Sequence, residues 1–287
     1  MKAYIHAIGR HNSLQEHTTS DLTLELKELS GKVYRRTDHF IQLAILGAHK
    51  ACSGRQLDKQ TGLIITSGQG NIEVFQKICH QRHINKMLPR PVDFINLLSN
   101  AAGFYVAAHL SLQGTNHFVS HHHFPVQMAL LSALSTIEQQ QDMAMLVGGV
   151  DAWHPDRQLH QKLLGRNLQS IPGEGSNWML LTKQPGDSRG EIRLTLPYLD
   201  ATGLNHLLNK QASGVFLSFS KKISEKHRAE IINSHAQCLH YWYEETCGTY
   251  ETLPMYVLNS FLATEQGTMI HIDKHDEQYM VMSVKTR

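Results

Sequence analysis

The sequence predicts a layered α/β fold, and three observations support this prediction. Short, continuously apolar runs such as Gly62–Thr66 and Met143–Val147 indicate strands that are buried on both faces. Longer apolar segments such as Thr37–Ala51 alternate with these runs and indicate helices. The chain has 287 residues, of which 41% are hydrophobic, so it can bury a large core without disulfide bonds or metal ions. Alternating strands and helices are typical of sheets covered by helices.

The first part of the chain contains most of the predicted elements. Its strands are Ala3–Ile8, Gly62–Thr66, Thr115–Ser120, Met143–Val147 and Asn177–Thr182, and its helices are Thr37–Ala51, a helix after Gly70, Phe94–Leu112 and Phe124–Gln139. Thr37 is a candidate N-cap of the first of these helices, because its hydroxyl can accept a hydrogen bond from a free backbone N–H. Pro125 lies in the first turn of the last helix, where a missing N–H costs nothing.

The pattern changes near the polar turn Gln184–Ser188, which is the best candidate for an internal boundary. We therefore expect an N-terminal half over residues 1–183 and a shorter C-terminal half over residues 184–287, packed as one compact unit. The second half is predicted to contain the strands Gly214–Phe219, Thr268–Asp273 and Gln278–Val284, and the helices Ser224–Ser234 and Thr252–Thr264.

Composition and charge exclude several classes of protein. Lys and Arg number 27 against 25 Asp and Glu, without a basic block, so nucleic-acid binding has no support. No apolar run is long enough to span a bilayer, and the first residues lack the apolar stretch of a signal peptide. The four cysteines form no CxxC pair, which favours reduced thiols and a cytoplasmic location.

Five motifs, in order along the chain, resemble those of the β-ketoacyl synthase family, which has the thiolase-like αβαβα fold. The resemblance covers most of the first half and is weaker in the second, which is shorter than in the enzymes. The motifs are RRTDHFIQ at 35–42, GLIITSGQG at 62–70, NAAGFYVAAHLSLQG at 100–114, LVGGVD at 146–151 and GEG at 173–175. In the third motif, Thr115 follows where a proline is usual.

The catalytic residues that this resemblance implies are absent. Enzymes of the family place a nucleophilic cysteine at the start of a buried helix, and spacing from Asn100, Gly114 and Ser120 puts His123 at that position. The chain has no HGTST motif, and Glu245 stands near the position of the second catalytic histidine. The connection Lys274–Glu277 has no glycine for the oxyanion-binding loop. These joint losses predict that the chain keeps the fold without the catalysis.

The resemblance therefore implies a chain length factor, a non-catalytic subunit that pairs with an active ketosynthase and shapes its acyl tunnel. Family members dimerise through the strand before the nucleophile, here Asn116, His117, Phe118, Val119 and Ser120, and their tunnel-gating residues correspond to Val92, Asp93 and Phe94. The expected partners are this ketosynthase and, through the complex, an acyl carrier protein. The compact, histidine-rich chain suggests an aryl-polyene type II polyketide system.

Two other functions stay open from the residues. His123 could itself serve as a nucleophile or base, in an acyltransferase or malonyl decarboxylase. The histidines His117, His121, His122 and His123 suggest a metal hydrolase, but three consecutive residues cannot all point to one ion. We therefore expect core or interface histidines and no metal. The sequence Gly68–Gly70 after a strand lacks the third glycine of a dinucleotide fingerprint, so no cofactor is expected.

Overall fold

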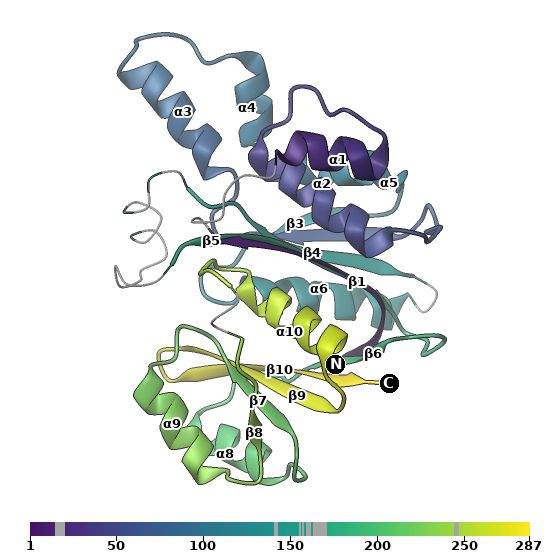
Figure 1. The fold of residues 1–287 in the computed structure, drawn as a ribbon, viewed down its shortest axis with the longest axis vertical. Coiled ribbons are helices and arrows are strands. Elements are labelled where there is room, and N and C mark those ends of the chain that lie inside the picture. Colours follow the sequence, from purple (N-terminus) through teal and green to yellow (C-terminus); the bar gives the residue numbers. More distant parts are fainter. Residues whose placement is uncertain are drawn as a thin grey trace.

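The computed structural model describes residues 1–14, 21–140, 143–154, 156, 158, 162, 171–243 and 247–287. Five layers of secondary structure are stacked in it: helices, a sheet, helices, a second sheet and helices again (Figure 1). The prediction of a layered αβαβα fold is confirmed. Among the helices that the structure describes, none is long and apolar enough to cross a bilayer.

The upper sheet of Figure 1 is formed by the first part of the chain, in the strand order β3-β2-β4-β5-β1. The five strands are β1 (Lys2–Leu14), β2 (Gly62–Thr66), β3 (Asn116–Val119), β4 (Met145–Asp151) and β5 (Gly173–Thr182). Strand β2 pairs in parallel with both β3 and β4, whereas β5 is antiparallel to both β4 and β1. The carboxyl ends of β2, β3 and β4 therefore meet at one edge of this sheet.

The lower sheet follows the order β6-β10-β9-β7-β8. Its strands are β6 (Gly190–Leu194), β7 (Phe216–Phe219), β8 (Leu239–His240), β9 (Thr268–His275) and β10 (Gln278–Thr286). The first residues of β1 pair with β6, while the rest of β1 pairs with β5. One long, bent strand thus joins the two sheets into a hydrogen-bonded sheet of ten strands.

Helices occupy the remaining three layers. Above the upper sheet lie α1 (Leu22–Ser30), α2 (His39–Cys52) and α5 (Ala101–Leu110), and between the sheets lie α6 (Pro125–Gln139) and α10 (Leu253–Thr264). Below the lower sheet lie α8 (Ala201–Asn209) and α9 (Glu225–Ser234). Two helices, α3 (Ile72–His83) and α4 (Pro91–Leu97), project from the top of the molecule (Figure 1).

Three hydrophobic clusters hold these layers together. One fills the space between the sheets and includes Leu130 and Phe261, and a second lies under the outer helices around Ile45 and Trp178. The third, around Leu217 and Ile272, lies between the lower sheet and its helices. Each helix of the central layer is apolar nearly all round because it faces a sheet on both sides.

The structure corrects two of the predicted helices. Asp38, not Thr37, is the N-cap of α2, and its carboxylate accepts a hydrogen bond of 3.1 Å from the backbone N–H of Ile41. The long helix predicted over Phe94–Leu112 is two helices, α4 and α5, separated at residues 98–100. The continuous apolar pattern is misleading here because the outer face of α4 is apolar but exposed.

Helix α2 approaches the sheet so closely that only glycine fits at Gly47. A Cβ atom there would lie 2.6 Å from the backbone oxygen of Ser176. We expect Gly47→Ala to lower the free energy of unfolding by about 1–3 kcal/mol, because a rigid backbone must move. Denaturant unfolding checks this value. The matched control is Gly203→Ala in α8, where the nearest atom to a Cβ is Oδ1 of the exposed Asp200 side chain, at 3.2 Å, and no backbone atom lies as close. An equal loss in both variants would contradict the packing explanation.

Candidate functional site

The parallel strands of the upper sheet end at a common edge, and this edge is where ligand sites lie in open α/β sheets. Strand β2 leads into the turn Ser67–Gly70, β3 into the histidines His121–His123, and β4 ends at Asp151. The central helices begin beside these ends, and the β9–β10 hairpin reaches them from the lower sheet. The site therefore contains residues of both halves of the chain.

His123 lies directly before Phe124, the N-cap residue of α6. Its ring stacks on the ring of His275, with 3.1 Å between the centroids and 14° between the planes. His122 covers another side of the ring at a centroid distance of 4.4 Å. Burial and the neighbouring His275 lower the pKa of His123, so this imidazole is neutral near pH 7. The β9–β10 hairpin thus covers His123, the residue that the sequence predicts at the nucleophile position.

His121 caps the start of α6 with its side chain. Its Nδ1 atom accepts hydrogen bonds from the backbone N–H groups of His123, at 3.2 Å, and Phe124, at 3.0 Å. A ring nitrogen that accepts these bonds carries no proton, and burial and Lys222 lower the pKa of His121 accordingly. The free N–H groups that a helix start offers to an anion are therefore partly occupied by this chain's own side chain.

Lys222 and Glu251 complete the contacts around His123. The Lys222 ammonium donates a hydrogen bond to the backbone oxygen of His123 and lies 3.2 Å from the carboxylate of Glu251. Lys222 follows strand β7, and Glu251 lies just before α10. Sequence reasoning identified neither residue, because about a hundred residues separate each of them from His123 and no local motif marks them.

The space beside this cluster is closed. A cavity between Lys222, Tyr243, Glu251 and Asp273 has a volume of only 10 Å³. That is about the volume needed for one water molecule and far below the several hundred Å³ of a typical ligand pocket. An acyl chain therefore has no room in this cavity as the structure has it.

Asp151 joins the two halves behind this cavity. Its carboxylate is buried and accepts three hydrogen bonds: from the hydroxyl of Ser67 at 2.7 Å, from the N–H of Gly68 at 2.9 Å and from the N–H of Thr252 at 2.7 Å. Burial raises the pKa of Asp151, although these bonds act in the opposite direction. The residue therefore fixes the start of α10 to the ends of β2 and β4.

Polar side chains fill the interior between the sheets next to the site. Gln127 of α6 donates a 3.0 Å hydrogen bond to Asp273, and Ser218 is bonded to Nδ1 of His271 at 2.8 Å. All four side chains are buried. Burial lowers the pKa of His271 to about 4, against the opposing effect of Asp273. This polar interior is unsuited to an acyl chain, because apolar groups there would leave hydrogen bonds unmade.

Three of the sequence motifs meet beside the same edge. His39 lies in the first motif and Glu174 in the GEG motif, and their side chains form an ion pair of 2.6 Å. Asp38 accepts a 2.7 Å hydrogen bond from Asn71, which follows the GQG turn. These contacts join segments that are more than 30 residues apart in the sequence. The motif regions therefore lie together in space as well as following one another along the chain.

The three predicted gate residues lie on α4. The Asp93 side chain is 6% exposed and accepts hydrogen bonds from Lys77, at 2.8 Å, and from Arg90, at 2.9 and 3.0 Å. The Arg90 hydrogen bond holds the pKa of Asp93 at about 2, so the carboxylate stays ionised. Phe94 is 60% exposed, and Val92 is half-buried. Asp93 therefore supports α4 from inside, and Phe94 faces outward.

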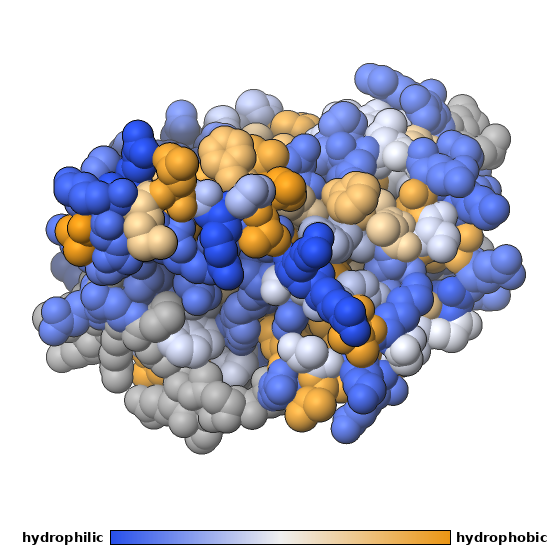
Figure 2. All heavy atoms as spheres, turned by 90° about the horizontal axis from the view of Figure 1, so that it is seen from above, coloured by the Kyte–Doolittle hydropathy of each residue, from blue (hydrophilic) through white to orange (hydrophobic). Residues whose placement is uncertain are grey.

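The predicted dimer strand, residues 116–120, lies at the edge of the upper sheet. Within the described residues β3 pairs only with β2, so its outer backbone groups have no strand partner. Asn116 and His117 are exposed, Phe118 and Val119 are half-buried, and Ser120 is exposed. Exposed hydrophobic residues of α4 and α5 lie nearby in the fold, namely Phe94, Ile95, Leu98 and Phe104. Figure 2 shows hydrophobic side chains gathered on part of the face that these helices form.

The remaining predictions concern Glu245 and metal binding. Glu245 lies outside the described residues. His121, His122 and His123 gather at the site, whereas His117 lies on β3. Among the residues with described positions, no group of three or more His, Cys, Asp or Glu could hold a metal ion.

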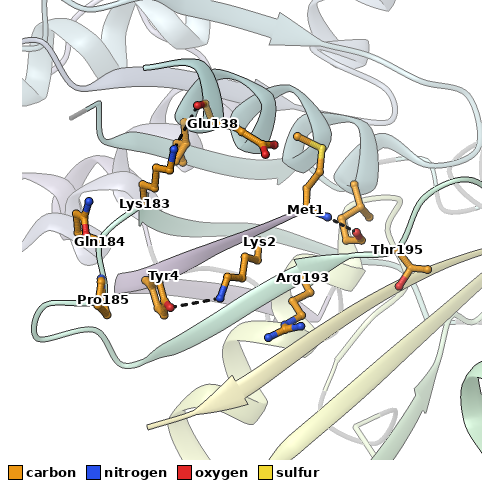
Figure 3. Close-up of a pocket in the computed structure, with 11 residues that line it drawn as sticks. Met1, Lys2, Tyr4, Glu138, Lys183, Gln184, Pro185, Arg193 and Thr195 are labelled. Atoms are coloured by element: carbon orange, nitrogen blue, oxygen red, sulfur yellow. Dashed lines mark hydrogen bonds between the residues drawn. The ribbon is translucent and has the colours of Figure 1, made fainter. Parts of the chain in front are cut away.

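A larger groove lies away from the site (Figure 3). It has a volume of 590 Å³ and lies between the start of β1, the end of α6 and the region around β6. Lys2, Lys183 and Arg193 line it together with Glu138, and Lys183 donates to the backbone oxygen of Glu138 at 3.4 Å. Lys183 lies at the carboxyl end of α6, where positive charge compensates the helix dipole, and both Lys2 and Arg193 form ion pairs with Glu191. We therefore interpret them as structural.

Fold and site together define a protein with the thiolase-like fold of β-ketoacyl synthases and chain length factors. No family model and no curated protein sequence matches the chain. Among solved structures, the ishigamide ketosynthase/chain length factor superposes with a TM-score of 0.72 at 13% identity, covering 100% of this chain and 99% of that one. A β-ketoacyl synthase from Burkholderia phymatum STM815 has a TM-score of 0.68 at 10% identity, with 100% and 99% coverage.

A third similar structure is the ketosynthase ApeO in complex with its chain length factor ApeC, from Xenorhabdus doucetiae. Its TM-score is 0.56 at 13% identity, and the match covers 100% of both chains. At sequence identities this low, the structural similarity establishes the fold alone. Any statement about function must therefore be argued from the residues of the site.

Proposed function

We propose that this chain is a non-catalytic, ketosynthase-like subunit that pairs with an active β-ketoacyl-[acyl carrier protein] synthase and shapes its acyl tunnel. The observation that carries the proposal is His123, a neutral imidazole at the predicted nucleophile position, whose ring is covered by the ring of His275. Neutral imidazole is a poor substitute for a cysteine thiolate that must hold an acyl chain as a thioester.

The similar structures support the choice of partners. Two of them are ketosynthase and chain length factor pairs, and another is a type II polyketide acyl carrier protein in complex with its ketosynthase. We therefore propose a heterodimer with an active ketosynthase, to which an acyl carrier protein delivers the chain. The likeness to the ApeO–ApeC pair supports an aryl-polyene system, and the four free cysteines favour the cytoplasm.

The outer edge of β3 is the proposed docking edge. Its unpaired backbone groups can add a strand from the partner, and Phe118 and Val119 can be covered in the same step. Because the cavity beside Lys222 and Glu251 is too small for an acyl chain, the chain would meet this subunit at its surface, on the outward face of α4. Phe94 is the gate residue that faces outward there, and we propose that it limits the length of the chain.

Recovery of the complex tests the proposal directly. We expect a tagged chain, purified from its own host, to bring down one full-length ketosynthase at one-to-one stoichiometry, as measured by mass spectrometry and native mass. In the isolated pair, His123→Ala is expected to leave condensation activity unchanged. A stable monomer or homodimer without a ketosynthase would exclude the proposal. Acyl transfer or CO₂ release by the chain alone, abolished in His123→Ala, would favour the enzyme alternative.

The length of the product tests the role of Phe94. We expect Phe94→Ala to shift the products of the reconstituted pair toward longer chains by at least one two-carbon unit, because it removes a large apolar side chain from the proposed tunnel wall. Mass spectrometry of the products measures the shift. Leu24→Ala, at an exposed site on α1, is the control. An unchanged product distribution with an intact pair would exclude Phe94 as the gate.

A further inference from the structure

Residues 72–90, which comprise α3 and its connection to α4 and which we name the arm, contribute to none of the three hydrophobic clusters. The structure describes all of them, and Val74 alone is buried. The arm projects from the upper layer (Figure 1). Isolated helices as short as α3, with 12 residues, are marginal in water, so tertiary contacts normally stabilise them.

The end of the arm nevertheless has a defined backbone. The N–H groups of Ile84 and Asn85 both donate to the oxygen of His80, and that of Met87 donates to the oxygen of Gln81, at 2.9 to 3.1 Å. Lys86 adopts a left-handed conformation with φ of 56°, which side chains rarely adopt. The turn therefore presents Met87 and Leu88 to solvent in a fixed geometry.

Exposed apolar and basic side chains share this arm. Phe75, Ile84, Met87 and Leu88 are between 49% and 78% exposed. The cations are Lys77, Arg82, Lys86 and Arg90, and the one acidic residue in the sequence of the arm is Glu73, in the first turn of α3. Lys77 and Arg90 are engaged with Asp93, but no described residue forms an ion pair with Arg82 or Lys86. Apolar anchors with a charged rim are the composition of protein interfaces.

We infer that the arm is a second docking element, which binds the ketosynthase partner in addition to the outer edge of β3. The inference rests on the proposed function. The partner surface that we expect is an apolar groove with carboxylates at its rim. Two observations support this occupant. The exposed cations Arg82 and Lys86, which pair with no described residue, are complementary to acidic groups on a partner, and the apolar surface continues through α4 and Phe104 of α5 to β3. Met87 and Leu88 enter the groove, and the two cations lie at its rim.

Binding of the purified chain to the ketosynthase recovered with it tests the inference. We expect the pair Met87→Ser and Leu88→Ser to weaken the complex at least tenfold, measured by surface plasmon resonance. The pair Arg82→Glu and Lys86→Glu is expected to slow association and reduce its dependence on salt. The matched control is Leu24→Ser with Leu29→Ser on α1, where both residues are also exposed, at 56% and 48%. Thermal melting of the free variants should be unchanged, because these side chains are not packed.

The outcomes separate this inference from the proposed function. Phe118→Pro in β3 serves as the reference, because it removes a backbone N–H from the docking edge. If this variant abolishes the complex while the arm variants bind like the unaltered chain, the arm is not an interface and the proposed function stands. If the unaltered chain forms no complex, the proposed function fails. Two other outcomes would also overturn the inference, if the arm variants bind the ketosynthase normally. One is self-association that requires the arm, and the other is binding to anionic phosphatidylglycerol vesicles that requires the arm.

Discussion

Replacing Asp151 by alanine is expected to lower the free energy of unfolding by about 3–5 kcal/mol, since three donors lose their acceptor, and the two that are buried, on Ser67 and Thr252, cost about 1–3 kcal/mol each. The donors are the hydroxyl of Ser67 and the N–H groups of Gly68 and Thr252. Chemical denaturation followed by circular dichroism measures the loss.

Two further variants sharpen this prediction. Asp151→Asn keeps one oxygen acceptor and avoids burying a charge. It should therefore lower the free energy of unfolding, but by less than Asp151→Ala does. Asp187→Ala removes an exposed carboxylate in the turn between β5 and β6 and should change stability by less than about 0.5 kcal/mol. A loss below about 1 kcal/mol for Asp151→Ala would contradict its role as the link between the halves.

The parts of the fold that the sequence predicts well are those whose pattern depends on burial alone. Gly62–Thr66 is a strand over the same residues in the structure, because an uninterrupted apolar run must be covered on both faces. The helix predicted over Phe124–Gln139 begins one residue later, at Pro125. Both elements are covered by other elements on each side, so their apolar residues are buried or half-buried and the pattern predicts the structure reliably.

Local sequence predicts the edges and the amphipathic parts less well. Helix α1 and strand β6 are short and carry polar residues, so no strong period marks them. The break between α4 and α5 is hard to predict because Phe94, Ile95 and Leu98 resemble a buried helix face in the sequence. In the structure these residues lie at the surface. A pattern of apolar residues cannot distinguish a core from a surface that another molecule covers.

The sequence predicts that His123 lies at the start of a helix, but it does not predict which residues surround His123. Motif spacing placed His123 at the start of α6, and the structure has it there. His275 lies in a connection that the motifs mark only by its lack of glycine, and no motif marks Lys222 or Glu251. Their contacts with His123 depend on how the lower sheet stacks against α6, a long-range arrangement that no local pattern encodes.

The stability of the chain is expected to fall by about 3 kcal/mol between pH 6.5 and pH 4 because of His271 alone. This residue has no exposed surface, and burial lowers its pKa from 6.5 to about 4. Below pH 6.5 the unfolded chain binds a proton that the folded chain does not bind. The stabilising contribution is therefore complete above pH 6.5, decreases as the pH falls, and is lost below pH 4.

The groups that face His271 determine how this prediction is tested. Ser218 bonds to Nδ1, Asp273 favours the charged ring, and Arg228 and Lys222 oppose it. His271→Asn retains a hydrogen-bonding partner for Ser218 without titrating, so its denaturation midpoint should depend less on pH over the same range, although burial also lowers the pKa of His109 to about 4. The exposed His206→Asn should follow the unaltered chain. If His271→Asn keeps the full pH dependence, another group carries it, and the neutral interior beside the site is not what limits acid stability.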